Sequence, residues 1–326
     1  MIPEMNLPDI YFEPVWGELY AIKDKGIHQV FHYNSINGEV YYSFVKRKID
    51  IKIDAETYFD IITPYGFSGP VVLNSTINKK EELLQEFKVH FDHFCNENRI
   101  VTDSCRFNPW LKNHVDFIHM YELVPNHTTV GIDLNVNNIF FDEFNYSKRK
   151  NIRKAERLGV TIHFDFQGKN LDSFLSIYEK TIIKNQIPPY YHFSKDFLLD
   201  NFKKLGNRIF FAYAEYEKKI ISITIFLLSE NYVHAHLGGN DTDYWEIPAN
   251  DALIYEVAEY GKKKGLKYLM LGGGGGNKAL HFHKIKFTKK SEFDFYKGRR
   301  ICNPDVYNKI LLNCKKVDNS FFPSYR

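Results

Sequence analysis

The chain has 326 residues, which is enough for one large or two medium domains. Hydrophobic residues make up 44% and charged residues 25%, as in an ordinary folded protein, and the net charge of +3 carries no global signature of nucleic-acid binding. The four cysteines form no C-x-x-C pair, so neither a disulfide scaffold nor a zinc site is expected. The first residues show no signal-peptide pattern, and the longest apolar run, 220–228, is too short to cross a bilayer. We therefore expect a cytoplasmic protein without a transmembrane segment and without DNA as a partner.

The first part of the chain is rich in predicted strands. β-Branched and aromatic residues predict strands at 40–45, 49–53 and 100–104. Proline and glycine mark residues 63–70 as a loop, and apolar residues at helical spacing predict a helix over 81–96. We expect residues 1–145 to form a first domain.

A strongly basic helix is predicted to open the second domain, residues 146–326. Ser147 is the expected N-cap of this helix, and Gly159 follows its last turn. A strand at 129–134 precedes the helix.

The rest of the chain alternates between strands and helices. The expected order is strand 161–166, helices 171–185 and 195–205, strands 209–216, 220–228 and 232–238, helix 250–264 and strand 268–271. This order predicts an α+β fold.

The basic helix carries its cations on one side. Six of the ten residues from 148 to 157 are Lys or Arg. At about 100° per residue, Arg149, Arg153 and Arg157 share one face. Such a stripe repels itself unless anions lie nearby, for example a nucleotide-sugar diphosphate, a tRNA backbone or an anionic lipid surface. The alternative, a solvated stripe whose charges are paired by Glu156 and other residues, stays open.

Five consecutive glycines, Gly272 to Gly276, follow the last predicted strand. Glycine loses more backbone freedom on folding than any other residue, so a run of it needs a reason. One reason is a backbone with positive φ, or close approach of a ligand to peptide N–H groups, and the end of a strand is where α/β sheets bind ligands. The G-x-x-x-x-G-K-[ST] and G-x-G-x-x-G patterns both fail at Asn277. We expect the N–H groups of Gly272, Gly273, Gly274 and Gly275 to bind a donor or a reaction oxyanion, with a surface turn as the alternative.

Four segments together resemble the Fem/GNAT-type acyltransferases, the group that includes the peptidoglycan bridge-forming enzymes. Residues 63–70 resemble the family's T-P-Y-G-x-x-G-P loop, and residues 106–109 resemble its R-F-x-P segment. Residues 149–160 resemble its R-x-x-I-R-K-A-x-x-x-G-V helix. The glycine run with residues 284–287 resembles its G-G-G…F-K-x-x-F ending, except that His283 replaces the usual Phe before the Lys.

The resemblance implies two GNAT-like mixed-sheet domains side by side, with the first on the acceptor side and the C-terminal segment packing back on it. It implies transfer of an acetyl or aminoacyl group to an amine, such as an amino sugar or peptide of a cell-surface glycan precursor. Lys284 matches the family's lysine and is the expected catalytic cation. The matching segments suggest Tyr65, Gly66 and Arg106 as substrate-binding candidates, and the basic stripe adds Arg149 and Arg153. Tyr191 is a further candidate, as part of an aromatic lip at 190–193, with a place in the core as the alternative.

The acyl donor stays open between acyl-CoA and aminoacyl-tRNA, both as co-substrates and not as bound cofactors. The long coiled-coil arm of many bridge-forming members is absent. GNAT enzymes bind the CoA pyrophosphate at an R/Q-x-x-G-x-G/A turn before the helix that follows their fourth core strand. Residues 238–241 and 248–250 occupy this place here and do not match that pattern. Asn250 in this stretch is our candidate for donor binding. The expected acceptor is a small molecule or a lipid-linked glycan. A tRNA is a further expected partner, and we also expect peripheral contact with a membrane.

The general base is chosen from two histidines on one strand. His234 and His236 alternate, so both side chains point to the same face. We take His236 as the candidate base, because a histidine accepts a proton near pH 7. A structural, hydrogen-bonded imidazole is the alternative. These residues with His281 and His283 lack the convergence that a zinc site needs, and we expect no metal.

A different function is also consistent with these patterns. The fold alone does not establish chemistry. A catalytically inactive GNAT-fold module that binds an anionic partner through the basic helix is the alternative to the acyltransferase.

Overall fold

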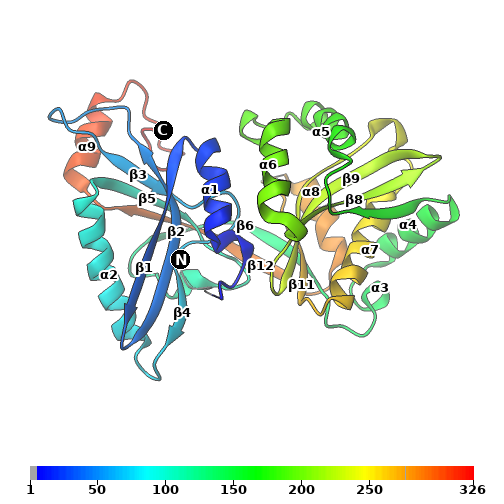
Figure 1. The fold of residues 1–326 in the computed structure, drawn as a ribbon, viewed down its shortest axis with the longest axis horizontal. Coiled ribbons are helices and arrows are strands. Elements are labelled where there is room, and N and C mark those ends of the chain that lie inside the picture. Colours follow the sequence, from blue (N-terminus) through cyan, green and yellow to red (C-terminus); the bar gives the residue numbers. More distant parts are fainter. Residues whose placement is uncertain (1–5, 276) are drawn as a thin grey trace. The chain divides into compact units, whose positions relative to one another are not determined.

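The computed structural model describes residues 6–275 and 277–326, and residue contacts divide the chain into two compact units (Figure 1). Unit 1 comprises the described part of Met1–Asn126 together with Asp294–Arg326, and unit 2 comprises His127–Phe293. The sequence placed the boundary near residue 146. In the structure the division falls within strand β6 (Glu122–Asp133), because residues 129–133 of this strand pair with a strand of unit 2. Gly276, the last residue of the glycine run, lies outside the described residues.

Unit 1 is a largely antiparallel sheet with three α-helices. The strand order is β1-β2-β3-β5-β12, with β4 beside β2, and β3 and β5 run parallel. The bounds are β1 (Gly26–Ser35), β2 (Gly38–Lys48), β3 (Phe59–Ile62), β4 (Val71–Ser75), β5 (Ile100–Arg106), the part of β12 (Glu292–Ile301) from residue 294 on, α1 (Pro14–Lys23), α2 (Lys80–Glu97) and α9 (Pro304–Asn313).

The core of unit 1 is mainly aromatic. Helix α2 buries Leu83, Phe87, Phe91 and Cys95, which recur at i, i+4 spacing and so line one face of the helix. The Phe87 and Phe91 rings stack with their centroids 5.6 Å apart.

The predicted strand at 49–53 is wrong. Strand β2 ends at Lys48, and within the range Ile53 forms an isolated bridge to Glu56. Asp54 and Ala55 between them have φ values of 52° and 66°, so the chain turns back on itself there.

Unit 2 has the strand order β6-β11-β10-β9-β8-β7. Its further strands are β7 (Thr161–Asp165), β8 (Ile209–Tyr216), β9 (Lys219–Leu228), β10 (Tyr232–Asn240) and β11 (Tyr268–Gly273). Its helices are α3 (Ile139–Asp142), α4 (Tyr146–Arg157), α5 (Leu171–Asn185), α6 (Lys195–Leu205), α7 (Ala249–Lys263) and α8 (Lys278–Lys284). The elements expected between residues 161 and 271 are thus confirmed in type and order.

Both faces of the unit 2 sheet are covered by helices. Successive residues of a strand point to opposite faces. On β8, the ring of Phe210 packs against Tyr260 of α7, with centroids 5.7 Å apart. The next ring, Phe211, packs against Phe174 of α5 at 5.3 Å. Helix α7 therefore lies on one face and α5 on the other.

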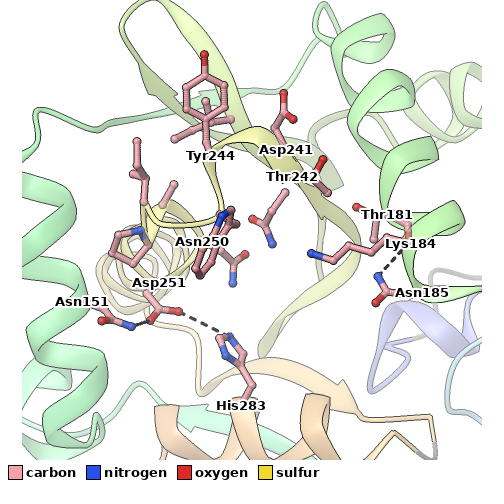
Figure 2. Close-up of a pocket in the computed structure, with 16 residues that line it drawn as sticks. Asn151, Thr181, Lys184, Asn185, Asp241, Thr242, Tyr244, Asn250, Asp251 and His283 are labelled. Atoms are coloured by element: carbon pink, nitrogen blue, oxygen red, sulfur yellow. Dashed lines mark hydrogen bonds and ion pairs between the residues drawn. The ribbon is translucent and has the colours of Figure 1, made fainter.

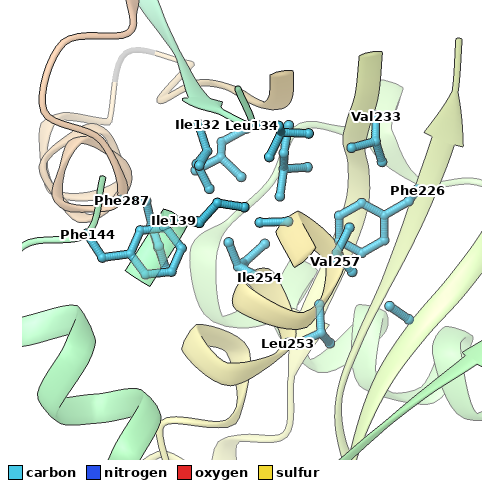
Figure 3. Packing of buried hydrophobic residues seen from close by; sticks show 14 of the residues in the cluster. Ile132, Leu134, Ile139, Phe144, Phe226, Val233, Leu253, Ile254, Val257 and Phe287 are labelled. Carbon is cyan, nitrogen blue, oxygen red and sulfur yellow. The ribbon is translucent and has the colours of Figure 1, made fainter. Parts of the chain in front are cut away.

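The main core of unit 2 surrounds α7 (Figure 3). Leu253, Ile254 and Val257 of this helix are at most 5% exposed and contact apolar residues of the sheet. Burial of a Leu, Ile or Val side chain contributes about 1.5–3 kcal/mol. The helix is therefore firmly fixed, and so is its N-terminus at the site described below.

The N-cap predicted for the basic helix is also wrong. Helix α4 begins at Tyr146, and the Asn145 side chain accepts a hydrogen bond from the Lys148 N–H at 3.1 Å. The Ser147 hydroxyl instead donates to the Asn145 side chain. Both Asn and Ser are favoured at the N-cap of a helix, so the sequence did not distinguish Asn145 from Ser147. The backbone geometry places Asn145 at the N-cap.

Within the described residues, no helix has the length and apolarity needed to cross a bilayer.

Candidate active site

Strands β10 and β11 pair in parallel and then separate. Their pairing covers three residue pairs and ends at His234 and Met270. Beyond these residues β10 continues beside β9, and β11 continues beside β6. Both strands are irregular where they separate, at 235–237 and at 270–272. Bulges turn backbone groups out of the ladder, and ligands bind beyond the carboxyl ends of parallel strands, so this opening is the candidate site.

The glycine run leaves β11 at this opening. Gly272 and Gly275 have φ values of 67° and 56°, which L side chains rarely adopt. A Cβ on Gly273 would lie 2.1 Å from the ring of the partly exposed His127 side chain, which would have to move. A Cβ on Gly274 would lie 2.5 Å from a backbone oxygen. Glycine in this run therefore allows positive φ values at some positions and close packing of the backbone at others.

Alanine substitutions should separate these two reasons. We expect Gly272→Ala to lower the free energy of unfolding by about 1 kcal/mol, since it meets only an unfavourable φ. Gly159→Ala is the matched control, because Gly159 has φ +81° and likewise no atom within 4 Å of a new Cβ. Gly274→Ala should cost clearly more than either, because its new Cβ would lie 2.5 Å from the backbone oxygen of Asn277. Urea unfolding of the three variants measures this, and equal losses for all three would contradict the packing argument.

Lys284 at the end of α8 binds the loop. Its ammonium donates to the carbonyl oxygens of Leu271 and Gly273 at 2.7 and 2.8 Å. Burial lowers the pKa of Lys284 to about 8. The ammonium therefore stabilises the irregular end of β11 and places a cation directly beside the opening.

A cavity of about 350 Å³ lies at the end of β10 and the N-terminus of α7 (Figure 2). Its wall is rich in amides, and the Trp245 side chain at its edge is 75% exposed. The amide residues are Asn151, Asn185, Asn240 and Asn250. His283 of α8 points into the cavity from below in the view of Figure 2. Such a lining suits a polar ligand of low charge.

A buried ion pair lies at the base of this cavity. Lys148 of α4 donates to Asp251 of α7 at 2.8 Å, and their side chains are 2% and 4% exposed. Asn151 donates to the other oxygen of Asp251 at 2.8 Å. The Lys148 ammonium also lies 3.1 Å from Nε2 of His283 and 4.1 Å from the centroid of the Phe287 ring. The carboxylate is thus fully paired and held in the first turn of α7, where the helix dipole favours it.

His283 remains a neutral imidazole near pH 7. Burial lowers its pKa, and the nearby cation of Lys148 lowers it further, although Asp251 acts in the opposite direction. The neutral ring faces the cavity, and its lone pair has the Lys148 ammonium as a donor, which lies within 3.2 Å of both ring nitrogens.

The structure brings together some of the residues expected in unit 2. Lys284 contacts the glycine run, whereas Asn250 lines the cavity with His283, and neither Lys284 nor the described glycines of the run line that cavity. His236 lies within the irregular part of β10, where burial lowers its pKa to about 3. This keeps its ring neutral and makes it a weak base. Tyr191 accepts a hydrogen bond from the Tyr178 hydroxyl through its backbone carbonyl.

The expected basic residues of α4 line a separate groove. Arg149 and Arg153 lie there with Lys150 and Arg157. A guanidinium N–H of Arg149 donates to the Phe144 carbonyl, whereas the Arg153 guanidinium lies 5.1 Å from a ring centroid.

The remaining candidates belong to unit 1, where each has a structural role. Arg106 donates to the backbone carbonyl of Thr63 at 2.6 Å. The Tyr65 ring stacks on Tyr20 with centroids 5.2 Å apart. Gly66 has φ +104°, and a Cβ there would lie 2.5 Å from the ring of Tyr11. These contacts stabilise the loop at 63–70, and the substrate-binding role of its residues stays a prediction.

Sequence reasoning missed the buried group at the base of the cavity. Lys148 was one of the six cations of the basic stripe, for which anion binding and solvation both stayed open, and Asp251 was not singled out. The replacement of Phe by His283 was noticed as a departure from the family pattern, and this was the available signal.

A protein-family model matches most of unit 2. Residues 143–282 match the model of the acetyltransferase (GNAT) domain. No curated protein matches the chain.

Solved structures resemble the whole chain in fold. The crystal structure of FemX has a TM-score of 0.70 at 11% identity, with 93% of this chain and 95% of that chain covered. The structure of L-PGS from Bacillus licheniformis has a TM-score of 0.51 at 14% identity, with 96% and 98% covered. A domain described as the C-terminal domain of a lysylphosphatidylglycerol synthetase from Agrobacterium fabrum has a TM-score of 0.55 at 13% identity, with 93% and 96% covered. The expected α+β class with GNAT-like domains is confirmed, and the described part of the chain has no coiled-coil arm.

Proposed function

Unit 2 carries a GNAT acetyltransferase domain, and from this premise we propose that the protein is an N-acyltransferase that transfers an acyl group to an amine. The observation that carries the proposal is the Lys284 ammonium at the irregular end of β11, where β10 and β11 separate. A donor carbonyl at this opening would lie beside a preorganised cation and the peptide groups of the glycine run. Such groups stabilise the oxyanion of acyl transfer.

The chemistry requires one bond exchange and one proton transfer. The amine nitrogen attacks the acyl carbon, a C–N bond forms, and the bond from the acyl carbon to the donor's oxygen or sulfur breaks. The proton released by the nitrogen passes to a base and then to the leaving oxygen or sulfur. His283 is the better candidate for this base, because it lines the cavity, whereas burial lowers the pKa of His236 to about 3.

For the donor, we propose an aminoacyl ester such as aminoacyl-tRNA ahead of acyl-CoA. GNAT domains generally use acyl-CoA, whose pyrophosphate needs cationic or N–H partners. Here Asp251 occupies the first turn of α7, and Asp241 lies beside it in the same cavity, held by Lys180 at 2.7 Å. Each of these carboxylates is paired with a lysine, so the donor proposal rests on two other features: residues 238–241 and 248–250 lack the family's pyrophosphate-binding pattern, and the amide-rich wall suits an uncharged ribose or amide.

For the acceptor, we propose an amine on a cell-surface precursor, either an amino sugar or peptide of a glycan or a lipid-linked group. The fold likeness to FemX and to lysylphosphatidylglycerol synthetases supports this class.

An inactive binding module remains the second candidate. It is favoured by the cations of α4, of which Lys150, Arg153 and Arg157 form no ion pair within the described chain.

The test compares donors directly. We expect aminoacyl-tRNA to raise the melting temperature and, with an amine acceptor, to give an amide product detected by mass spectrometry. Acetyl-CoA is the parallel arm, and product from acetyl-CoA alone would overturn the donor proposal while leaving the acyltransferase intact. Absence of product with every donor, together with stabilisation by any polyanion, would support the binding module.

A further inference from the structure

The exposed side of α4 is a basic groove. A shallow groove of about 420 Å³ is lined by Tyr146, Arg149, Lys150, Arg153, Glu156 and Arg157. It therefore holds four cationic side chains and one carboxylate. No ion pair in the described part of the chain involves any of these cations. Like charges at i, i+4 destabilise a helix, so this arrangement calls for an external anion.

Two exposed aromatic side chains, Tyr146 and Phe141, lie at the start of α4 and on the preceding helix α3. Tyr146 at the start of α4 is 72% exposed, and Phe141 of α3 is 55% exposed. The Phe141 ring packs against Phe140 at 5.2 Å, and the Arg153 guanidinium lies 5.1 Å from the same Phe140 ring. Phe141 and Arg153 therefore both contact the Phe140 ring.

This combination of groups points to one kind of partner. Aromatic and aliphatic side chains enter the boundary between lipid head groups and acyl chains, while Lys and Arg remain at the level of the phosphates. RNA would use the cations, but Tyr146 is the single ring among the described residues that line the groove, whereas single-stranded RNA stacks successive bases on several rings. The charges and the apolar groups together fit a bilayer better than a nucleic acid.

We propose that the basic aromatic face, defined as Phe141, Tyr146, Arg149, Lys150, Arg153 and Arg157, docks unit 2 on an anionic membrane surface. The inference does not rest on acyl transfer, and it holds for an active enzyme and for an inactive module. Docking of this kind would place the domain at the bilayer, where a lipid-linked acceptor is found.

The test is co-sedimentation of the full chain with phosphatidylcholine vesicles, with and without phosphatidylglycerol. We expect binding to the anionic vesicles only, and weakening as salt is raised. Lys150→Gln with Arg153→Gln should lower the partition coefficient by on the order of 25-fold, at about fivefold per cation. Lys203→Gln with Lys204→Gln removes the same charge from exposed positions of α6 and is the matched control, expected to lose far less.

Two further measurements complete the test. Phe141→Ser with Tyr146→Ser should weaken the binding that persists at high salt, since this part comes from apolar insertion. Equal binding by the two charge variants, or equal binding to neutral and anionic vesicles, would overturn the proposal. Tight binding of RNA without binding to anionic vesicles would overturn it in favour of a nucleic acid. Far-ultraviolet circular dichroism of each variant checks that the loss is not unfolding.

Discussion

Lys284→Met is expected to reduce acyl transfer by about 100- to 1,000-fold, the usual effect of removing one oxyanion donor. Methionine keeps much of the side-chain volume and removes the ammonium that lies beside the opening between β10 and β11. The carbonyls of Leu271 and Gly273 also lose their donor. Part of the effect is therefore a displaced loop, at about 1–3 kcal/mol for each buried oxygen left unpaired.

The control for this variant is Lys278→Met. Lys278 is an exposed lysine at the start of the same helix. We expect this variant to keep the wild-type kcat, and thermal melting of both proteins separates a chemical loss from an unfolded loop. A Lys284→Met protein that melts below the wild type but turns over at the same rate would show that the lysine is structural.

The pH profile distinguishes two roles of Lys284. Its pKa is lowered to about 8 by burial, so the ammonium predominates below this pH and the neutral amine above it. If the ammonium stabilises the oxyanion, the rate falls as pH rises through about 8. If the neutral amine is the base, the rate instead rises up to about 8. We expect the fall, because two carbonyl oxygens accept hydrogen bonds from the charged form.

The second large effect concerns the buried ion pair. Lys148→Met is expected to lower the free energy of unfolding by about 3–5 kcal/mol, because it leaves the Asp251 carboxylate buried without its cation. Urea unfolding measures the loss. Lys150→Met is the control on the same helix, where the side chain is exposed, and should stay within about 0.5 kcal/mol of the wild type.

A double substitution tests whether pairing is the cause. Lys148→Met with Asp251→Leu removes both charges and should recover much of the loss, since an apolar pair of similar volume often replaces a buried ion pair at little cost. A double variant as unstable as the sum of the two single variants would indicate that the two side chains contribute independently.

Local patterns predicted most elements of unit 2. Apolar spacing and the stops at Gly159 and Gly265 placed α4 and α7, and β-branched runs placed β8 and β9. The errors occurred where two neighbouring residues suit one role, as at Asn145 and Ser147, or where a turn interrupts an apolar run, as at 49–53.

Part of the candidate site could also be predicted from local sequence patterns. A run of glycine is rare enough to mark a special backbone, and Lys284 follows it closely. His236, in contrast, was favoured for its residue type. Burial, which depends on the packed sheet, lowers its pKa to about 3 and makes it a poor base.

The sequence by itself determined the α+β order of elements, the glycine run and the charge of α4, because each of these depends on residues close together in the chain. Tertiary structure alone decided which charges are buried. Lys148 and Asp251 are 103 residues apart and meet because α4 packs on α7, whereas Lys150 and Arg153 of the same helix remain in solvent. A pattern of charges along a helix does not show which side of it another helix will bury. The free energy of a charge depends on whether it is buried or in water.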